Sequence, residues 1–305
     1  MNRSTDFALL LLPAAIWASL VVVGVSVLTD VGPVALACIT WAVAAVVLVG
    51  ATFQRLRSHA ATLRHEIWLL AISALTGVAA FQAFWFDGLL SANPVNVAVL
   101  TATLPVMIAA AAALFLGERL GAIQSVGVVF TLAGAVWIGV AGEIDQLRIA
   151  HFGHGEALIL LANVSMATYT VILKRRPSAL PPLEFMAITA LLGALMLLPW
   201  AIAEADSAAS WERIVRHWQG ILYIGVVASA AAYVLWNRSV VRNGANLTGM
   251  SLYTQPLFGV AFCYVFLGQP VLSYHWLGLL LICVGVLLVV LTGEGAQTLR
   301  HAGSA

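Results

Sequence analysis

The chain has 305 residues, of which 62% are apolar and 9% are charged, and its formal net charge is +1 at pH 7. An ordinary soluble domain is about half apolar and about a quarter charged. The composition therefore excludes a soluble enzyme, a disordered chain and a nucleic-acid-binding protein. It predicts an all-α membrane protein, because about 20 apolar residues cross a bilayer as one helix.

Ten apolar stretches are each predicted to be a membrane-spanning helix; nine of them lack Asp, Glu, Lys and Arg, and 183–203 contains only Glu184, at its start. They cover residues 7–28, 33–53, 67–86, 93–116, 122–141, 157–173, 183–203, 218–237, 246–267 and 274–292. The first stretch follows Asp6 and has no small-x-small cleavage site, which favours a retained span over a signal peptide. The polar segment 204–217 is typical of a short amphipathic helix on the membrane surface.

Basic residues are distributed unevenly between the two sides of such a membrane protein. With ten spans, one side holds both termini and four loops and carries eleven Lys or Arg residues, whereas the other side carries Arg148, Arg213 and Arg216. Basic residues accumulate on the cytoplasmic side of membrane proteins. We therefore expect a multi-pass protein of a bacterial-type inner membrane, with cytoplasmic N- and C-termini.

The two halves of the chain resemble each other. The matches under a shift of 151 residues include Trp85 with Trp236, Pro105 with Pro256, and Phe-Leu-Gly at 115–117 with the same triplet at 266–268. The polar segment 142–156 separates the halves, so the expected units are residues 1–145 and 146–305. Five helices in each unit would invert the second unit relative to the first. The expected fold is ten transmembrane helices as two inverted five-helix repeats, a construction that secondary transporters use.

Motif residues in both halves carry a resemblance to a known family. They are Trp17, Pro105, Phe115-Leu116-Gly117-Glu118, Gly127, Gly134, Pro256, Phe266-Leu267-Gly268, Gly278 and Gly285. In these residues the chain resembles the EamA type of the drug/metabolite transporter superfamily and, within it, the bacterial exporters of aromatic amino acids. The resemblance implies solute transport by ten helices in two inverted repeats. Gln269 departs from the family pattern, because it replaces the usual acid in the second half.

Polar and aromatic residues within the spans are the candidates for solute binding, because no Asp, Glu, Lys, Arg or His lies at the centre of a span. That absence disfavours intramembrane proteases and a proton relay built on a buried carboxylate. The candidates are Trp17, Gln82, Trp85, Asn96, Thr101, Thr103, Asn163, Tyr169, Tyr233, Trp236, Tyr253 and Gln255. The alternative for each is structural, since Ser and Thr often bond their own helix and Trp often anchors at the interface.

Two prolines lie half-way along the fourth and ninth spans. Pro105 and Pro256 each remove a backbone N–H, which would free the carbonyl groups of Thr101 and Leu252 for a substrate ammonium. The kinks would also act as hinges between the halves. The alternative is a fixed kink stabilised by packing.

The predicted function is transport of small neutral or zwitterionic solutes by alternating access, with aromatic and other apolar amino acids as substrates and export as the direction. The alternatives are a drug or metabolite efflux transporter of the same fold and a non-transporting membrane sensor. A lipid-modifying enzyme would need a charged or metal-binding cluster, which the sequence lacks, and we expect neither a metal nor a cofactor. The expected partners are the amino-acid-like solute and membrane lipids, with no nucleic acid. Helices five and ten would support the bundle or a homodimer.

Overall fold

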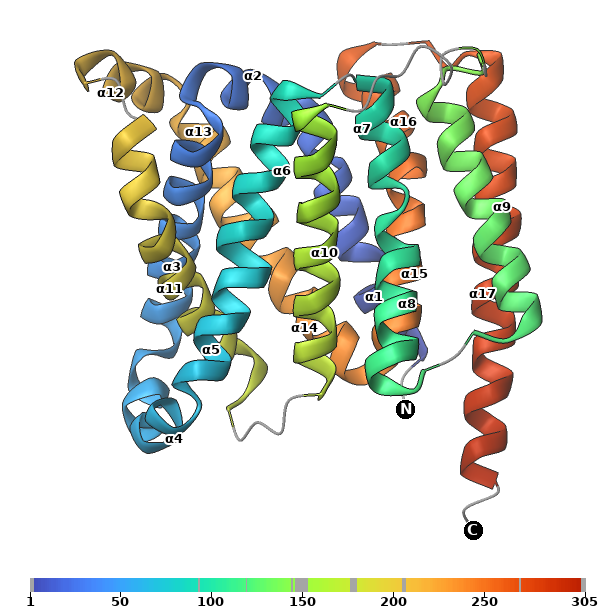
Figure 1. Ribbon diagram of the computed structural model, residues 1–305, viewed down its shortest axis with the longest axis horizontal. Coiled ribbons are helices and arrows are strands. Elements are labelled where there is room, and N and C mark those ends of the chain that lie inside the picture. Colours follow the sequence, from blue (N-terminus) through green and yellow to red (C-terminus); the bar gives the residue numbers. More distant parts are fainter. Residues whose placement is uncertain are drawn as a thin grey trace.

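The computed structural model of the chain describes residues 3–92, 94–118, 120–143, 145, 153–175, 180–204, 207–268 and 270–302. This part of the chain is almost entirely helical and contains no β-strand. The helices stand side by side as a bundle (Figure 1). The all-α class expected from the sequence is confirmed.

The helices up to residue 139 follow the predicted spans but divide two of them. They are α1 (Arg3–Ala18), α2 (Leu20–Val31), α3 (Pro33–Ser58), α4 (Ala60–His65), α5 (Ile67–Ala74), α6 (Ala80–Ser91), α7 (Pro94–Thr101), α8 (Leu104–Leu116) and α9 (Ala122–Gly139). A break at Ser19, whose hydroxyl donates to the Ile16 carbonyl oxygen at 2.6 Å, separates α1 from α2. A turn at residues 102–103, just before Pro105, separates α7 from α8. A five-residue π-helix, η1 (Leu75–Ala79), joins α5 to α6.

The second part of the chain has similar interruptions. Its helices are α10 (His154–Arg175), α11 (Pro182–Glu204), α12 (Ser207–Arg216), α13 (Trp218–Tyr223), α14 (Ala232–Asn243), α15 (Ala245–Ser251), α16 (Gln255–Leu267) and α17 (Ser273–Ala302). The π-helix η3 (Ile224–Ala231) lies between α13 and α14, and the 3₁₀ turn η4 (Leu252–Thr254) lies between α15 and α16. The helix expected near 204–217 is present as α12.

Seven helices, counting adjoining segments as one, are long and apolar enough to cross a membrane in the described ranges. They are Pro33–Ser58, Ile67–Ser91, Ala122–Gly139, His154–Arg175, Pro182–Glu204, Trp218–Asn243 and Ala245–Leu267. Three shorter apolar helices cover Ala8–Gly24, Leu104–Leu116 and Ser273–Val289. The turn at residues 102–103 divides one predicted span, and three of the ten apolar helices are short, so the count of ten stays a prediction.

The core lies where α3, α10, α11 and α14 meet. Its fully buried side chains include Trp41, Tyr169, Phe185 and Trp236. Large apolar side chains are also exposed on the outside of the bundle: Val46 at 74%, Trp68 at 78% and Leu114 at 79%. In water such a surface would be unfavourable, whereas lipid tails solvate it well. The molecule is therefore built as a multi-pass membrane protein.

The pair formed by α9 and α17 packs through glycines. A Cβ added to Gly127 would lie 2.7 Å from the carbonyl oxygen of Gly285, and one added to Gly134 would lie 2.6 Å from that of Gly278. Small residues of this kind let two helix backbones approach closely, which is a common basis of helix association in membranes. The four glycines that match between the halves therefore serve packing.

Candidate functional site

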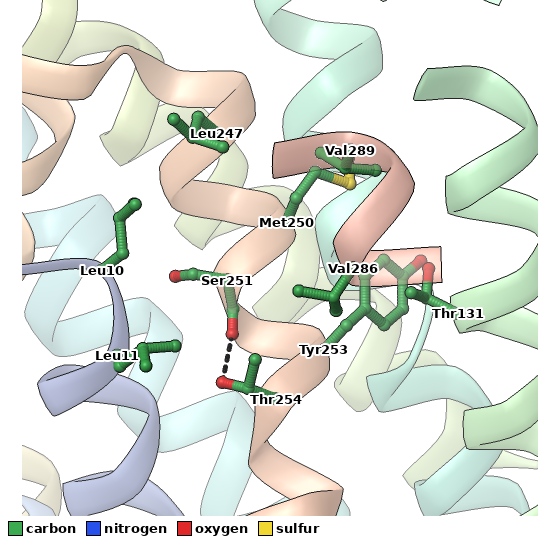
Figure 2. Close-up of a pocket in the computed structure, with 10 residues that line it drawn as sticks. All are labelled: Leu10, Leu11, Thr131, Leu247, Met250, Ser251, Tyr253, Thr254, Val286 and Val289. Carbon is green, nitrogen blue, oxygen red and sulfur yellow. Dashed lines mark hydrogen bonds between the residues drawn. The ribbon is translucent and has the colours of Figure 1, made fainter. Parts of the chain in front are cut away.

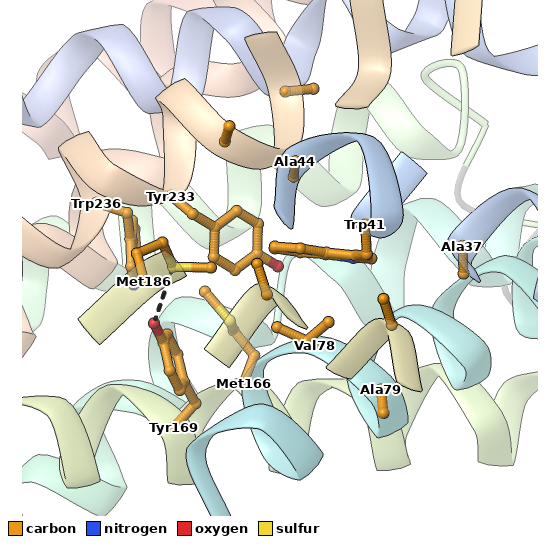
Figure 3. Close-up of a cluster of buried hydrophobic side chains, with 14 of the residues drawn as sticks. Ala37, Trp41, Ala44, Val78, Ala79, Met166, Tyr169, Met186, Tyr233 and Trp236 are labelled. Carbon is orange, nitrogen blue, oxygen red and sulfur yellow. Dashed lines mark hydrogen bonds between the residues drawn. The ribbon is translucent and has the colours of Figure 1, made fainter. Parts of the chain in front are cut away.

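Five aromatic rings from four helices meet in the core, and four of them are labelled in Figure 3. Tyr233 on α14 is at the centre, with ring centroids 4.8 Å from Trp41 on α3, 5.3 Å from Trp17 on α1 and 6.4 Å from Tyr169 on α10. Trp236 is 5.4 Å from Trp17. We refer to these five residues as the aromatic cluster. Four of the five are predicted site residues, and the structure brings these four together.

Trp41 is the member that the sequence analysis missed. It is fully buried in the middle of α3, whereas interfacial tryptophans lie near the ends of spans. Its position at the centre of an apolar stretch was the available signal. Met186 of α11 and Asn237 of α14 also contact the cluster and were not in the predicted set.

The two π-helices lie next to the aromatic cluster. The Trp17 indole N–H donates to the carbonyl oxygen of Ala228 in η3 at 2.9 Å. In η1, a Cβ on Gly77 would collide with the ring of Tyr169, so only glycine lets that ring pack here. π-Helical turns are rare and occur frequently at functional sites. Their presence on both sides of the cluster supports a functional role for it.

Three hydrogen-bond donors of the cluster have no partner in the part of the chain that the structure describes. The Tyr233 hydroxyl and the indole N–H groups of Trp41 and Trp236 are buried and unpaired among the described residues. In contrast, the Tyr169 hydroxyl donates to Asn237 Oδ1 at 2.8 Å. Buried polar groups are nearly always paired in native proteins, so each unpaired group needs an explanation. An indole N–H can only donate, which means that an acceptor would satisfy this set.

A second polar group surrounds the break in the fourth span. The side-chain amide of Asn163 on α10 donates to the carbonyl oxygen of Leu100 at 2.8 Å and to Thr103 Oγ1 at 3.2 Å. The hydroxyls of Thr101 and Thr103 donate to the carbonyl oxygens of Val97 and Leu100. Three of the candidates therefore satisfy backbone groups at the interruption. Asn163 Oδ1 is the buried acceptor left without a hydrogen bond.

Three further candidates of the first half lie elsewhere. Trp85 stacks on Phe81 with ring centroids 6.1 Å apart and packs beside the small cluster around Ile159. Gln82 is buried on the same helix, α6. Asn96 donates to Glu156 Oε1 at 2.7 Å, near the start of α10 and not at mid-helix. Within the described ranges, the ring of Trp85 contacts Phe81 and not the rings of the aromatic cluster.

The two prolines begin helices rather than bending them. Pro105 stands in the first turn of α8 and Pro256 in the first turn of α16. The expectation of a free carbonyl at Leu252 is wrong, because the N–H of Gln255 donates to it. The chain tightens into the 3₁₀ turn η4, whose hydrogen bonds span three residues instead of four. This shift recovers the bond that Pro256 cannot make.

A cavity of about 180 Å³ lies between α1, α9, α15, α17 and the η4 turn (Figure 2). Tyr253, a predicted site residue, lines it, as do Ser251, Thr254 and Thr131. The hydroxyls of these last three donate to carbonyl oxygens of their own helices, at 2.7 to 2.9 Å. The surfaces that they turn to the cavity are therefore apolar. A cavity of about 150 Å³ holds a benzene ring, so this space suits one ring-sized apolar group.

Charged groups lie at the ends of helices. Glu184 is fully buried at the start of α11, with Oε1 3.7 Å from Arg55 Nη1. At the opposite end, His217 Nε2 lies 2.7 Å from Asp30 Oδ2, and this hydrogen bond and charge hold the pKa of Asp30 below its usual value. In the described part of the chain, no group of three or more His, Cys, Asp or Glu residues could hold a metal ion. None of the five residues of the aromatic cluster is an Asp, Glu, Lys, Arg or His.

Comparison with protein families gives a match over both halves of the chain. The model of the EamA-like transporter family matches residues 6–140 and again residues 153–291. The two matches leave out only the ends and the segment around residues 141–152.

Several proteins are similar to the chain over most of its length. The transporter YetK of Bacillus subtilis, which is uncharacterized, is 24% identical over 82% of this chain and 76% of its own. The uncharacterized transporter sll0355 of Synechocystis is 25% identical over 92% and 88%. A probable terminal-alkyne amino-acid exporter of Streptantibioticus cattleyicolor is 26% identical over 73% of each chain. A protein known from a crystal structure shares 21% identity, with a TM-score of 0.78 over 97% of this chain and 99% of its own, which supports the fold alone.

Proposed function

The chain belongs to the EamA-like transporter family, and we propose that it transports zwitterionic amino acids with aromatic or other apolar side chains by alternating access. It is a membrane transporter of the drug/metabolite type, and the names of its family and relatives point to a transporter and not to an enzyme. The substrate, the direction (export) and the mechanism are the proposed parts.

We infer the substrate class from the three donors of the aromatic cluster that have no partner among the described residues. The Tyr233 hydroxyl and the two indole N–H groups can each donate to a carboxylate. Hydrogen bonds to a charged acceptor are about twice as strong as neutral ones. The cluster has no cationic side chain, so the solute's charge must be balanced from within the solute itself. A zwitterion meets that condition.

The aromatic faces suit the rest of such a solute. An ammonium group over a Trp or Tyr face gains about 0.5–2 kcal/mol, and an aromatic side chain can stack on the same rings. One relative, at 26% identity, is named as a probable amino-acid exporter, which agrees with this class. Of the predicted site residues, we assign Trp17, Tyr169, Tyr233 and Trp236 to the solute site.

We also propose the ten-helix arrangement in two inverted units, residues 1–145 and 146–305. The seven long spans and the three shorter apolar helices together account for ten crossings. The family model matches the chain twice, and the two π-helices begin 149 residues apart, at Leu75 and Ile224. α1 begins and α17 ends at the same end of the bundle (Figure 1). The excess of basic residues at that end supports its proposed location in the cytoplasm of a bacterial-type cell.

Uptake into liposomes tests the proposed substrate. Purified protein would be reconstituted, and labelled tryptophan, phenylalanine and threonine would be supplied with and without a pH gradient. We expect saturable uptake of tryptophan or phenylalanine that unlabelled aromatic amino acids compete away. Acceleration by the gradient would indicate proton coupling, and indifference would indicate facilitated diffusion. Absence of flux for all three would refute the amino-acid assignment in favour of a drug or another metabolite.

A matched pair of tryptophans tests the proposed site. Trp236→Phe removes a buried indole N–H without a partner, and Trp218→Phe changes a tryptophan that is 57% exposed at the start of α13. We expect the first substitution to raise the half-saturating concentration several-fold and the second to leave it unchanged. Equal effects of the two variants would contradict the assignment of the cluster.

A further inference from the structure

A glutamate joins the two halves of the chain at one end of the molecule. Glu118 follows α8, and its carboxylate accepts hydrogen bonds from the backbone N–H groups of Asn246 at 3.0 Å and Ala245 at 3.4 Å. These are the first residues of the apolar helix Ala245–Leu267. Gly244, just before it, has φ +90°, and a Cβ there would lie 3.2 Å from Glu118 Oε1. A carboxylate in this place satisfies orphan N–H groups and complements the helix dipole.

The main contact between these two spans lies at that end, between α8 and α15. Further in, Ile108 of α8 packs on Gly249 of α15, where a Cβ would lie 2.9 Å from the isoleucine side chain. Beyond the turn at residues 102–103 and the η4 turn, the helices separate. There α7 packs against α9 and α10, whereas α16 packs against α1 and α2. The two proline-containing spans therefore have their main contact between Glu118 and the interruptions.

Glu204 has the same chemistry at the opposite end but joins a different pair. Its Oε2 accepts a hydrogen bond from the backbone N–H of Ala35 at 2.6 Å, beside Gly32 with φ +91°. This bond links α11 to the start of α3. Those two helices pack along much of their length and are paired again at the far end, where Arg55 faces Glu184. Loss of the Glu204 contact would therefore leave the α3–α11 pair joined.

We propose that Glu118 is a latch that holds the end of the molecule with the chain termini closed. The proposal rests on the alternating access proposed above between residues 1–145 and 146–305. A path to that end can open between α8 and α15 only when they separate, and separation requires the carboxylate to leave both N–H groups. The release of one side chain thus controls which end of the transporter is accessible. The α3–α11 pair is joined at both ends by the Glu204 and Arg55–Glu184 contacts, so it stays together when α8 and α15 separate.

Cysteine labelling tests the latch without any solute. Ala112 is fully buried on α8, one turn from Ile108 on the same face, so Ala112→Cys would serve as the reporter. The three native cysteines would first be replaced by serine or alanine: Cys38, Cys263 and Cys283. The rate of reaction with a hydrophilic maleimide would be measured on purified protein in detergent. Loss of a helix cap weakens a structure by about 1 kcal/mol, so Glu118→Ala should accelerate labelling about fivefold.

Two further variants complete the experiment. Glu118→Gln keeps an acceptor oxygen but loses the charge, so it should accelerate labelling less than Glu118→Ala does. Glu204→Ala is the matched control and should leave the rate at the parent value. Labelling of both Glu118 variants at the parent rate would overturn the latch. Equal acceleration by Glu204→Ala would overturn it too, because general loosening would then explain the result. Absence of amino-acid flux in liposomes would overturn the substrate and not the latch.

Discussion

Two tyrosine-to-phenylalanine substitutions within the aromatic cluster should change stability in different directions. The Tyr169 hydroxyl donates to Asn237 Oδ1 at 2.8 Å, and both residues are fully buried. Tyr169→Phe leaves the amide oxygen without that bond in a dry core, and it should destabilise the protein by about 1–3 kcal/mol. The Tyr233 hydroxyl is buried without a partner, so Tyr233→Phe removes a desolvated polar group. That change should leave stability unchanged or raise it by about 1–2 kcal/mol.

The two variants would be compared with the parent by unfolding in one detergent, with helix content followed by circular dichroism. Tyr233→Phe should nevertheless weaken transport, because the lost donor served the solute. A hydrogen bond to a charged acceptor contributes about 1.5–3 kcal/mol, which corresponds to a roughly 10- to 100-fold loss of apparent affinity. If Tyr233→Phe destabilised the protein as much as Tyr169→Phe, its hydroxyl would have a partner in the folded chain. The argument from unpaired donors would then fail.

Two further predictions concern packing and pH. Gly134→Ala would place a Cβ 2.6 Å from the Gly278 carbonyl oxygen, so it should destabilise the α9–α17 pair by about 1–3 kcal/mol. The control is Gly259→Ala, whose Cβ would have nothing within 4 Å. That substitution should be neutral or should stabilise the protein by up to about 1 kcal/mol. Unfolding midpoints in detergent measure both, and equal midpoints would contradict the close approach. Because His217 lowers the pKa of Asp30, their pair should stabilise the fold above the usual pKa of an aspartate and lose this contribution as the pH falls through the lowered pKa. The Asp30→Asn variant should therefore have a lower free energy of unfolding than the parent near neutral pH and the same free energy of unfolding in acid. A difference in unfolding free energy that stayed constant with pH would argue against the pair.

The helical class and most span positions follow from the sequence, because apolar stretches bounded by charges leave the backbone no alternative to a helix in lipid. The interruptions are harder to predict. The break at Ser19 has no adjacent proline or glycine to indicate it, and serine hydroxyls bond to their own helix in unbroken helices as well. The π-helices lie in stretches that are apolar on every face, so an extra residue in a turn leaves no trace in the hydrophobic pattern.

The candidate site was predictable in part. Trp17, Tyr169, Tyr233 and Trp236 were identified as aromatic residues within spans, and they meet in the core. Their contact with Trp41 depends on how α3 packs against helices of the second half. The internal repeat alone does not specify that packing. Similarly, Asn163 and Thr103 lie together because a helix is broken beside them. Long-range packing at these points decides which polar residues remain unpaired.

The unpaired donors of the cluster have a practical consequence for identifying the solute. A ligand that pairs them binds only the folded protein, so at a concentration 100 times its dissociation constant it should raise the free energy of unfolding by about 2.7 kcal/mol. The unfolding temperature rises with it. The melting curve of the purified protein thus becomes an assay that needs neither a membrane potential nor a radiolabel. A library of metabolites can be ranked by thermal shift, and Tyr233→Phe would separate solutes held by the cluster from detergent-like stabilisers.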